Sequence, residues 1–105
     1  MLTRAFIDKI VRDLVMEGFV PGPQDKYGAA PCRDSFIGYI NSSLYKDAQD
    51  CNGFIPVLMY PFAGVELPNE IGAIGNMRIV LDKKIDPSKI AVDSISRREF
   101  NIDME

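Results

Sequence analysis

Residues 66–82 read ELPNEIGAIGNMRIVLD, and this stretch decides the fold predicted for the chain. Apolar residues stand on both sides of the Gly75-Asn76 pair. Glycine and asparagine adopt positive backbone angles at little steric cost, so this pair can reverse the direction of the chain. The stretch is therefore predicted to form a β-hairpin.

An amphipathic helix is predicted over residues 3–17. Its apolar residues recur at helical spacing and form one wide stripe that would face a core: Phe6, Ile7, Ile10, Val11, Leu14 and Val15. Thr3 is expected to cap the N-terminus, and Gly18 is expected to end the helix. Asp8 and Arg12 are expected to form an ion pair one helical turn apart.

Two elements are predicted between this helix and the hairpin. Residues 36–40 form a nearly continuous apolar run, which is typical of a strand covered on both faces, so we expect a central strand. Asn41-Ser42-Ser43 is a capping sequence, and the apolar spacing that follows predicts a short helix over residues 44–51. Lys46 and Asp50 are expected to pair on its solvent side.

Residues 54–62 are extended by propensity. Pro56 and Pro61 place this segment at the edge of a sheet or in a mixture of loop and strand, because proline cannot donate to a ladder of hydrogen bonds. Burial in the core is the favoured interpretation for Tyr60 and Phe62, and an exposed aromatic contact surface is the alternative.

The remaining residues, 83–105, are predicted to form a turn at Asp86-Pro87, a weak strand and a loosely held tail. With 105 residues the chain is long enough for one core and too short for two. We therefore expect a single α/β (α+β) domain over residues 1–105, with a small central sheet, two packed helices and a C-terminal β-hairpin.

The chain contains no histidine, which removes the usual general base and the commonest zinc ligand. Ser-His and Cys-His catalytic pairs are excluded for the same reason. Cys32 and Cys51 do not have the spacing of a metal site, and we expect free thiols. No catalytic residue, metal site, cofactor or enzymatic activity is therefore predicted.

The charge and hydropathy of the chain bear on its partners. Twelve basic and 15 acidic residues give a formal net charge of -3, so no specific affinity for nucleic acid is expected. The longest apolar run, residues 54–62, contains two prolines and is far shorter than a bilayer span. Residues 1–20 also lack the continuous apolar centre of a signal peptide. We expect no membrane partner and a cytosolic location.

The glycines of the hairpin allow two binding interpretations. Ile71-Gly-x-x-Gly75-x-x-x-Ile79 has the spacing of a KH domain, whose Gly72-x-x-Gly75 loop would clamp a single-stranded nucleic acid. Ala73 and Ile74 replace the basic or small polar residues usual in such a loop, and strand-forming residues follow. A phosphate-binding turn of an enzyme is the second interpretation, but no Lys-Ser or Lys-Thr pair follows the glycines.

A third interpretation rests on resemblance to a known family. Glu70-Ile71-Gly72-x-x-Gly75-x-x-Arg78-Ile79-Val80 is similar to a signature near the C-terminal part of tailed-bacteriophage major capsid (coat) proteins. Three segments upstream also resemble that family, in the same order: the helix at residues 2–14, the strand and capped helix that begin at residue 36, and Phe54-Ile-Pro-Val57. The resemblance covers residues 2–82, and residues 83–105 match nothing in it.

The resemblance implies the fold of the axial domain of the coat protein and a structural function, namely self-association of subunits in a viral shell. The implied partners are other capsid subunits, and the implied location is the virion or the cytoplasm of a bacterial host. Ile71, Gly72 and Gly75 would shape the sheet. Glu70 and Arg78 would form an ion pair, either across the hairpin or to a neighbouring subunit.

Together with Tyr60 and Phe62, Glu70 and Arg78 are the candidate subunit contacts. Coat subunits of this family are several times longer, and 105 residues leave no room for their N-terminal arm, extended loop and long spine helix. We therefore expect a fragment, a remnant or separately encoded capsid domain, or a domain reused for another interaction.

Overall fold

The computed structural model describes residues 2–18, 36–60, 68–93 and 99–103. Their elements follow the order α1 (Arg4–Met16), β1 (Phe36–Ile40), the 3-10 turn η1 (Ser42–Leu44), α3 (Tyr45–Gln49), β2 (Ile55–Pro56), the 3-10 turn η2 (Val57–Met59), β3 (Glu70–Ile74), β4 (Met77–Leu81), β5 (Lys89–Asp93) and β6 (Glu99–Asp103). The fold is α+β, as the sequence predicts.

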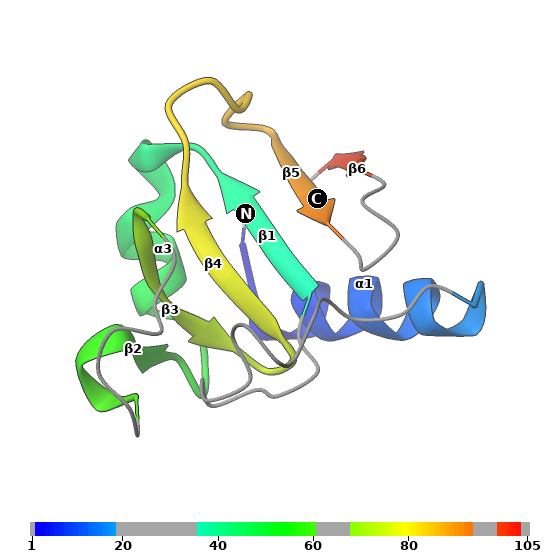
Figure 1. Cartoon of the computed structure of the whole chain (residues 1–105), viewed down its shortest axis with the longest axis horizontal. Coiled ribbons are helices and arrows are strands. Elements are labelled where there is room, and N and C mark those ends of the chain that lie inside the picture. The colour runs from blue at the N-terminus through cyan, green and yellow to red at the C-terminus, as the bar shows by residue number, and fades with distance from the viewer. Residues whose placement is uncertain (1, 19–35, 61–67, 94–98, 104–105) are drawn as a thin grey trace.

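The described strands form one mixed sheet in the order β2-β3-β4-β1-β5-β6 (Figure 1). β1 runs parallel to β4, with Phe36 opposite Met77 and Ile40 opposite Leu81, and the other described neighbours are antiparallel. The predicted central strand is confirmed, because β1 lies between β4 and β5. The predicted edge is confirmed too, since β2 ends the sheet with only Ile55 and Pro56.

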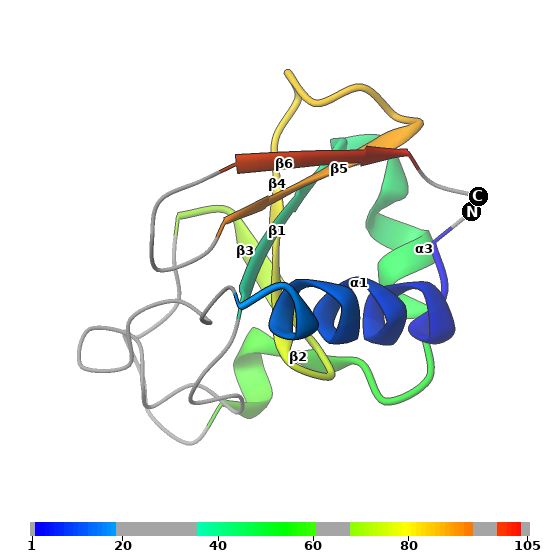
Figure 2. The same ribbon diagram turned by 90° about the vertical axis from the view of Figure 1, so that its right-hand side faces the viewer.

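Both described α-helices pack on the same face of the sheet (Figure 2). Phe6, Ile7, Ile10 and Leu14 of α1 join a core that includes Ala48 of α3 and these residues of the sheet: Phe36, Ile40, Ile74, Met77, Ile79, Ile90 and Val92. Side chains alternate along a strand, so the intervening residues of β1 and β4 point to the opposite face. Ile37, Tyr39, Arg78 and Val80 share that second face.

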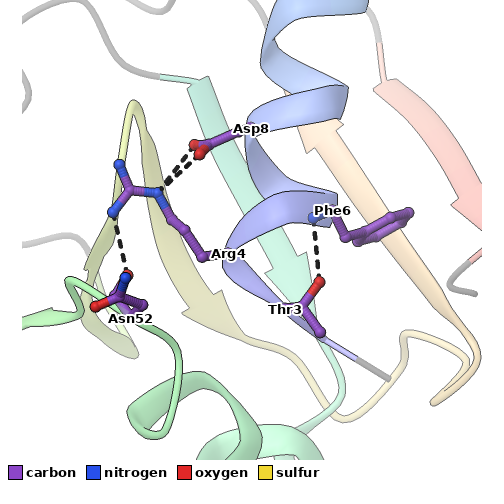
Figure 3. A network of polar contacts seen from close by, with 5 residues as sticks. All are labelled: Thr3, Arg4, Phe6, Asp8 and Asn52. Atoms are coloured by element: carbon purple, nitrogen blue, oxygen red, sulfur yellow. Dashed lines mark hydrogen bonds and ion pairs between the residues drawn. The ribbon is translucent and has the colours of Figure 1, made fainter.

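The local signals of α1 are largely confirmed. The Thr3 hydroxyl accepts a hydrogen bond from the Phe6 amide at 3.1 Å, which caps the helix (Figure 3). Gly18 has a φ of 90° directly after the last turn. The predicted Asp8–Arg12 pair is wrong, because Asp8 instead accepts from Arg4 Nε at 3.0 Å.

A contact outside the helix explains this exchange of partners. Arg4 also donates from Nη1 to the Asn52 carbonyl at 3.1 Å, and that bond holds its guanidinium between α1 and the loop before β2 (Figure 3). Arg12 lies further along the exposed side of α1, where its Nε is 4.0 Å from Asp13 Oδ1. Helical spacing alone does not predict a hydrogen bond between residues so far apart in the chain.

The second helix is shorter than predicted. Residues 42–44 form η1, and the α-helical part is limited to Tyr45–Gln49. The Asn41 side chain caps η1 by accepting from the Ser43 amide at 2.9 Å, and the Lys46–Asp50 pair is present at 3.9 Å.

The weak strand predicted after the turn at Asp86-Pro87 is confirmed as β5, whereas the prediction of a loosely held tail is wrong for residues 99–103. They form β6, which pairs with β5 over five positions from Lys89–Asp103 to Asp93–Glu99. β5 itself lies beside the central strand β1, and its Ile90, Ala91 and Val92 are buried. Residues 83–105, which the capsid resemblance does not cover, therefore contribute two strands to the sheet.

None of the helices in the described part of the chain is long and apolar enough to span a membrane.

Candidate functional site

The β3–β4 hairpin carries a buried ion pair on the face of the sheet opposite the helices. Glu70 lies opposite Val80, so its side chain is a diagonal neighbour of Arg78 on the same face. Arg78 donates from Nη2 to Glu70 Oε1 at 2.7 Å and from Nε to Glu70 Oε2 at 2.9 Å. This two-pronged geometry matches the planar guanidinium to the planar carboxylate.

Tyr60 completes the group. Its hydroxyl donates to Glu70 Oε2, and its ring centroid lies 5.9 Å from Arg78 Cζ, within the range of a cation–π contact. The three side chains come from the end of η2, from β3 and from β4, and each residue is buried. We call Tyr60, Glu70 and Arg78 the buried triad.

The electrostatics of the triad favour a permanently charged Arg78. Burial alone would lower the pKa of Arg78, but the hydrogen bonds and negative charge of Glu70, with a smaller contribution from Tyr60, raise it above its ordinary value. Among the described residues, every buried side-chain nitrogen and oxygen has a hydrogen-bond partner. The triad is thus a satisfied polar network that ties three segments together.

The geometry of Gly72 and Gly75 explains their place in the motif. A Cβ on Gly72 would lie 2.4 Å from the Ile55 carbonyl oxygen, so glycine allows β2 to approach β3 closely. The β-bulge between Glu70 and Gly72 adds to this local irregularity. Gly75 has a φ of 58° in the turn and lies against Arg4 and Asp8 of α1. Both glycines therefore shape the sheet, as the sequence predicts.

The same geometry removes the structural basis of the KH interpretation. A nucleic-acid clamp needs an exposed loop between its glycines. Here Gly72, Ala73 and Ile74 are buried residues of β3, and the turn at Gly75 packs on the N-terminal half of α1. The Gly72-x-x-Gly75 segment is therefore not an exposed loop that could clamp a nucleic acid.

Exposed apolar side chains gather next to the triad. Leu58 is 93% exposed, Met59 is 71% exposed, and Ile55 is 36% exposed. All three belong to β2 and η2, the segment 55–59 that precedes Tyr60, and we call this segment the β2–η2 edge. Phe62, predicted as a further contact residue, lies outside the described residues.

A second feature lies at the carboxyl ends of the parallel strands β1 and β4. A pocket of about 630 Å³ opens there between the ends of the strands and the residues that precede β3. We call it the strand-end pocket; it is lined by Tyr39, Ser42, Pro68, Asn69, Glu70, Ile71, Val80, Leu81, Asp82, Lys83 and Lys84. The sequence analysis did not predict this pocket. The available signal for it was the Lys83-Lys84 pair, which directly follows a predicted strand.

No family model matches the sequence, and neither a curated protein nor a solved structure matches it. In the described part of the chain, no group of three or more Cys, Asp or Glu side chains is arranged to hold a metal ion. The functional conclusion therefore rests on the triad, the β2–η2 edge and the motif residues that connect them.

Proposed function

We propose that the chain is a structural domain of the phage major-capsid type, whose function is self-association of subunits in a shell. Residues 1–82 would correspond to the axial region, with β5 and β6 as an addition to its sheet. The order of helix, strand, capped helix, edge strand and hairpin in the described residues agrees with the collinear resemblance over residues 2–82. The partner we assign is a second copy of the chain.

The proposal rests on the position of the buried triad beside the exposed side chains of the β2–η2 edge. The two charged residues of the family motif, Glu70 and Arg78, do not face solvent but hold Tyr60 in place. Tyr60 directly follows Leu58 and Met59, which expose most of their apolar surface. A rigid polar anchor thus presents exposed apolar side chains at the edge of a sheet, and exposed apolar patches of this kind are typical of protein contacts.

The edge also has the chemistry of a contact between copies. β2 is short and contains Pro56, so it offers few free backbone groups for uncontrolled strand pairing. Leucine and methionine side chains can instead pack into the apolar surface of a neighbour, where each buried side chain contributes about 1.5–3 kcal/mol. We assign the β2–η2 edge as the contact, and we assign to the triad the role of fixing its shape.

Sedimentation velocity over a concentration series tests the proposal with the unmodified chain and two double variants. Leu58→Ser with Met59→Ser removes the apolar contact, and Val15→Ser with Met16→Ser is the matched control, because those side chains are 51% and 80% exposed at the end of α1. We expect the unmodified chain and the control to self-associate, and the edge variant to associate at least tenfold more weakly. A chain that stays monomeric at millimolar concentration, or equal association of all three proteins, would contradict the proposal.

A further inference from the structure

The strand-end pocket has the size of a ligand site. It lies at the carboxyl ends of β1 and β4, the parallel neighbours among the described strands. Its volume of about 630 Å³ falls within the usual range for small-molecule sites, which is about 300–1,000 Å³.

Hydrogen bonds between distant segments hold the walls of the strand-end pocket in place. The Asn41 side-chain amide, at the end of β1, donates to the Ile85 carbonyl at 2.8 Å, so it fastens the turn that follows β4. The Asp82 amide donates to the Ile40 carbonyl at 2.8 Å, and the Leu81 amide donates to the Asn69 carbonyl at 3.1 Å. Binding would therefore require little reorganisation.

The rim of the strand-end pocket carries two cationic side chains. Lys83 and Lys84 are exposed, and neither forms an ion pair within the described residues, whereas Lys46 is paired with Asp50. Two acidic residues also line the pocket. The side chain of Glu70 is 0% exposed and is paired with Arg78, so its carboxylate does not reach the pocket surface, whereas the carboxylate of Asp82 accepts a hydrogen bond from the Lys84 amide at 2.9 Å. The rim thus keeps an excess of positive charge in a chain whose net charge is -3.

The interior of the strand-end pocket is different in character. The half-buried ring of Tyr39 lines it together with Ile71, Val80 and Leu81. An aromatic ring beside aliphatic side chains favours a planar, weakly polar group, whereas lysines favour a phosphate. We propose that the strand-end pocket binds a nucleotide, with its phosphate at Lys83 and Lys84 and its base against Tyr39.

Such a nucleotide is either free or one unit of a single strand, because both present the same phosphate and base. In either case the site would engage about two positive charges. For a single strand, a plot of the logarithm of the affinity against the logarithm of the salt concentration should therefore have a slope no steeper than about -1.4. This shallow slope separates one local site from general attraction to nucleic acid.

The test is a titration of the isotopically labelled full chain, followed by amide NMR shifts, with thymidine monophosphate, a six-residue thymidine oligonucleotide and inorganic phosphate as separate probes. Lys83→Gln with Lys84→Gln removes the two rim charges. Arg12→Gln with Lys46→Gln is the matched control, because it removes two exposed charges elsewhere. An unchanged pattern of the remaining amide signals shows that each variant is folded.

We expect shifts at residues 39, 42, 83 and 84, submillimolar affinity for the monophosphate, and at least tenfold weaker binding in the rim variant only. Tyr39→Leu should weaken binding of the monophosphate and leave binding of inorganic phosphate unchanged. Tighter binding of the oligonucleotide than of the monophosphate would identify a strand as the source, and equal binding would identify a free nucleotide. The proposal is overturned if no probe binds at 5 mM, a concentration about tenfold above the expected range. It is also overturned if both double variants lose affinity equally, or if inorganic phosphate binds as tightly as the nucleotide.

Discussion

Arg78 reaches across the β3–β4 hairpin and places two of its nitrogens on the two carboxylate oxygens of Glu70, at 2.7 and 2.9 Å, while Tyr60 donates to one of the same oxygens. The Arg78 side chain is 1% exposed, and the Glu70 side chain is 0% exposed. A charge buried to this degree is stable only with its partner. The pair therefore connects the stability of the hairpin to the position of the β2–η2 edge.

Glu70→Gln is expected to lower the free energy of unfolding by about 3–5 kcal/mol, because it leaves the Arg78 charge buried without a counter-charge. Urea denaturation followed by circular dichroism measures this change. Asp8→Asn is the matched control, since it breaks the exposed pair with Arg4 and is expected to cost less than about 1 kcal/mol. Equal losses in the two variants would show that burial does not set the strength of the Glu70 pair.

Tyr60→Phe keeps the buried ring and removes the hydrogen bond to Glu70. Hydrogen bonds to charged groups contribute about 1.5–3 kcal/mol, and we expect a loss of this order. Hydrogen exchange should accelerate at the end of η2, where the Tyr60 amide donates to the Val57 carbonyl at 3.1 Å, and self-association should weaken although Leu58 and Met59 are unchanged. Tyr45→Phe, at a tyrosine that is 45% exposed, is the control and should alter neither property. Unaltered exchange in η2 would mean that Tyr60 does not anchor this segment.

Gly72→Ala is expected to separate β2 from β3. The added methyl group would lie 2.4 Å from the Ile55 carbonyl oxygen, which is backbone and cannot rotate away. A cost of about 1–3 kcal/mol is typical of overpacking, and hydrogen exchange at Ile55 should rise together with it. Asn76→Ala, on an exposed turn residue, provides a control with little expected effect. A Gly72→Ala protein as stable as the parent would argue against close approach of the strands.

Cys51 is expected to react slowly with thiol reagents at neutral pH. Burial raises the pKa of its thiol, and the charges of Asp47 and Asp50 raise it further. In a Cys32→Ser protein, the alkylation rate of native Cys51 should therefore rise at a higher pH than in the same protein unfolded in urea. The folded-state pKa of Cys51 is the higher one, so the folded protein favours the protonated thiol. The stability that this preference contributes is complete below the unfolded pKa of about 8.5 and is lost as the pH rises through the folded pKa. A native rate profile at or below the unfolded one would contradict this prediction.

Local features of the fold could be predicted from the sequence because their causes are local. The period of the apolar residues indicates α1, Thr3 caps it, and the positive φ of Gly75 closes the hairpin. The prolines of residues 54–62 likewise indicate an edge, because proline cannot donate to a neighbouring strand. These features involve residues that are close in the chain.

Pairing between distant strands was not predictable in the same way. The parallel contact of β1 with β4 joins Phe36 to Met77, and no residue pattern in either strand specifies that partner. β6 was missed because Glu99, Asn101 and Asp103 are poor strand formers, and its conformation depends on pairing with β5.

The same distinction between local and long-range contacts applies to the candidate site. Spacing across a predicted hairpin is enough to suggest contact between Glu70 and Arg78. The hydroxyl of Tyr60 reaches Glu70 from outside the hairpin, so only the assembled fold reveals that bond. The strand-end pocket depends on three segments that meet at the ends of β1 and β4, and a linear pattern does not describe such a concave surface.

The most direct measurement of the central claim is hydrogen–deuterium exchange of the unmodified chain at low and high protein concentration. If copies of the chain associate through the β2–η2 edge, protection of the amides of Ile55 and residues 57–59 should increase with concentration, while the exposed end of α1 at Val15 and Met16 should not change. Protection that is independent of concentration, or that increases only away from the β2–η2 edge, would contradict the assignment of this edge as the contact between subunits.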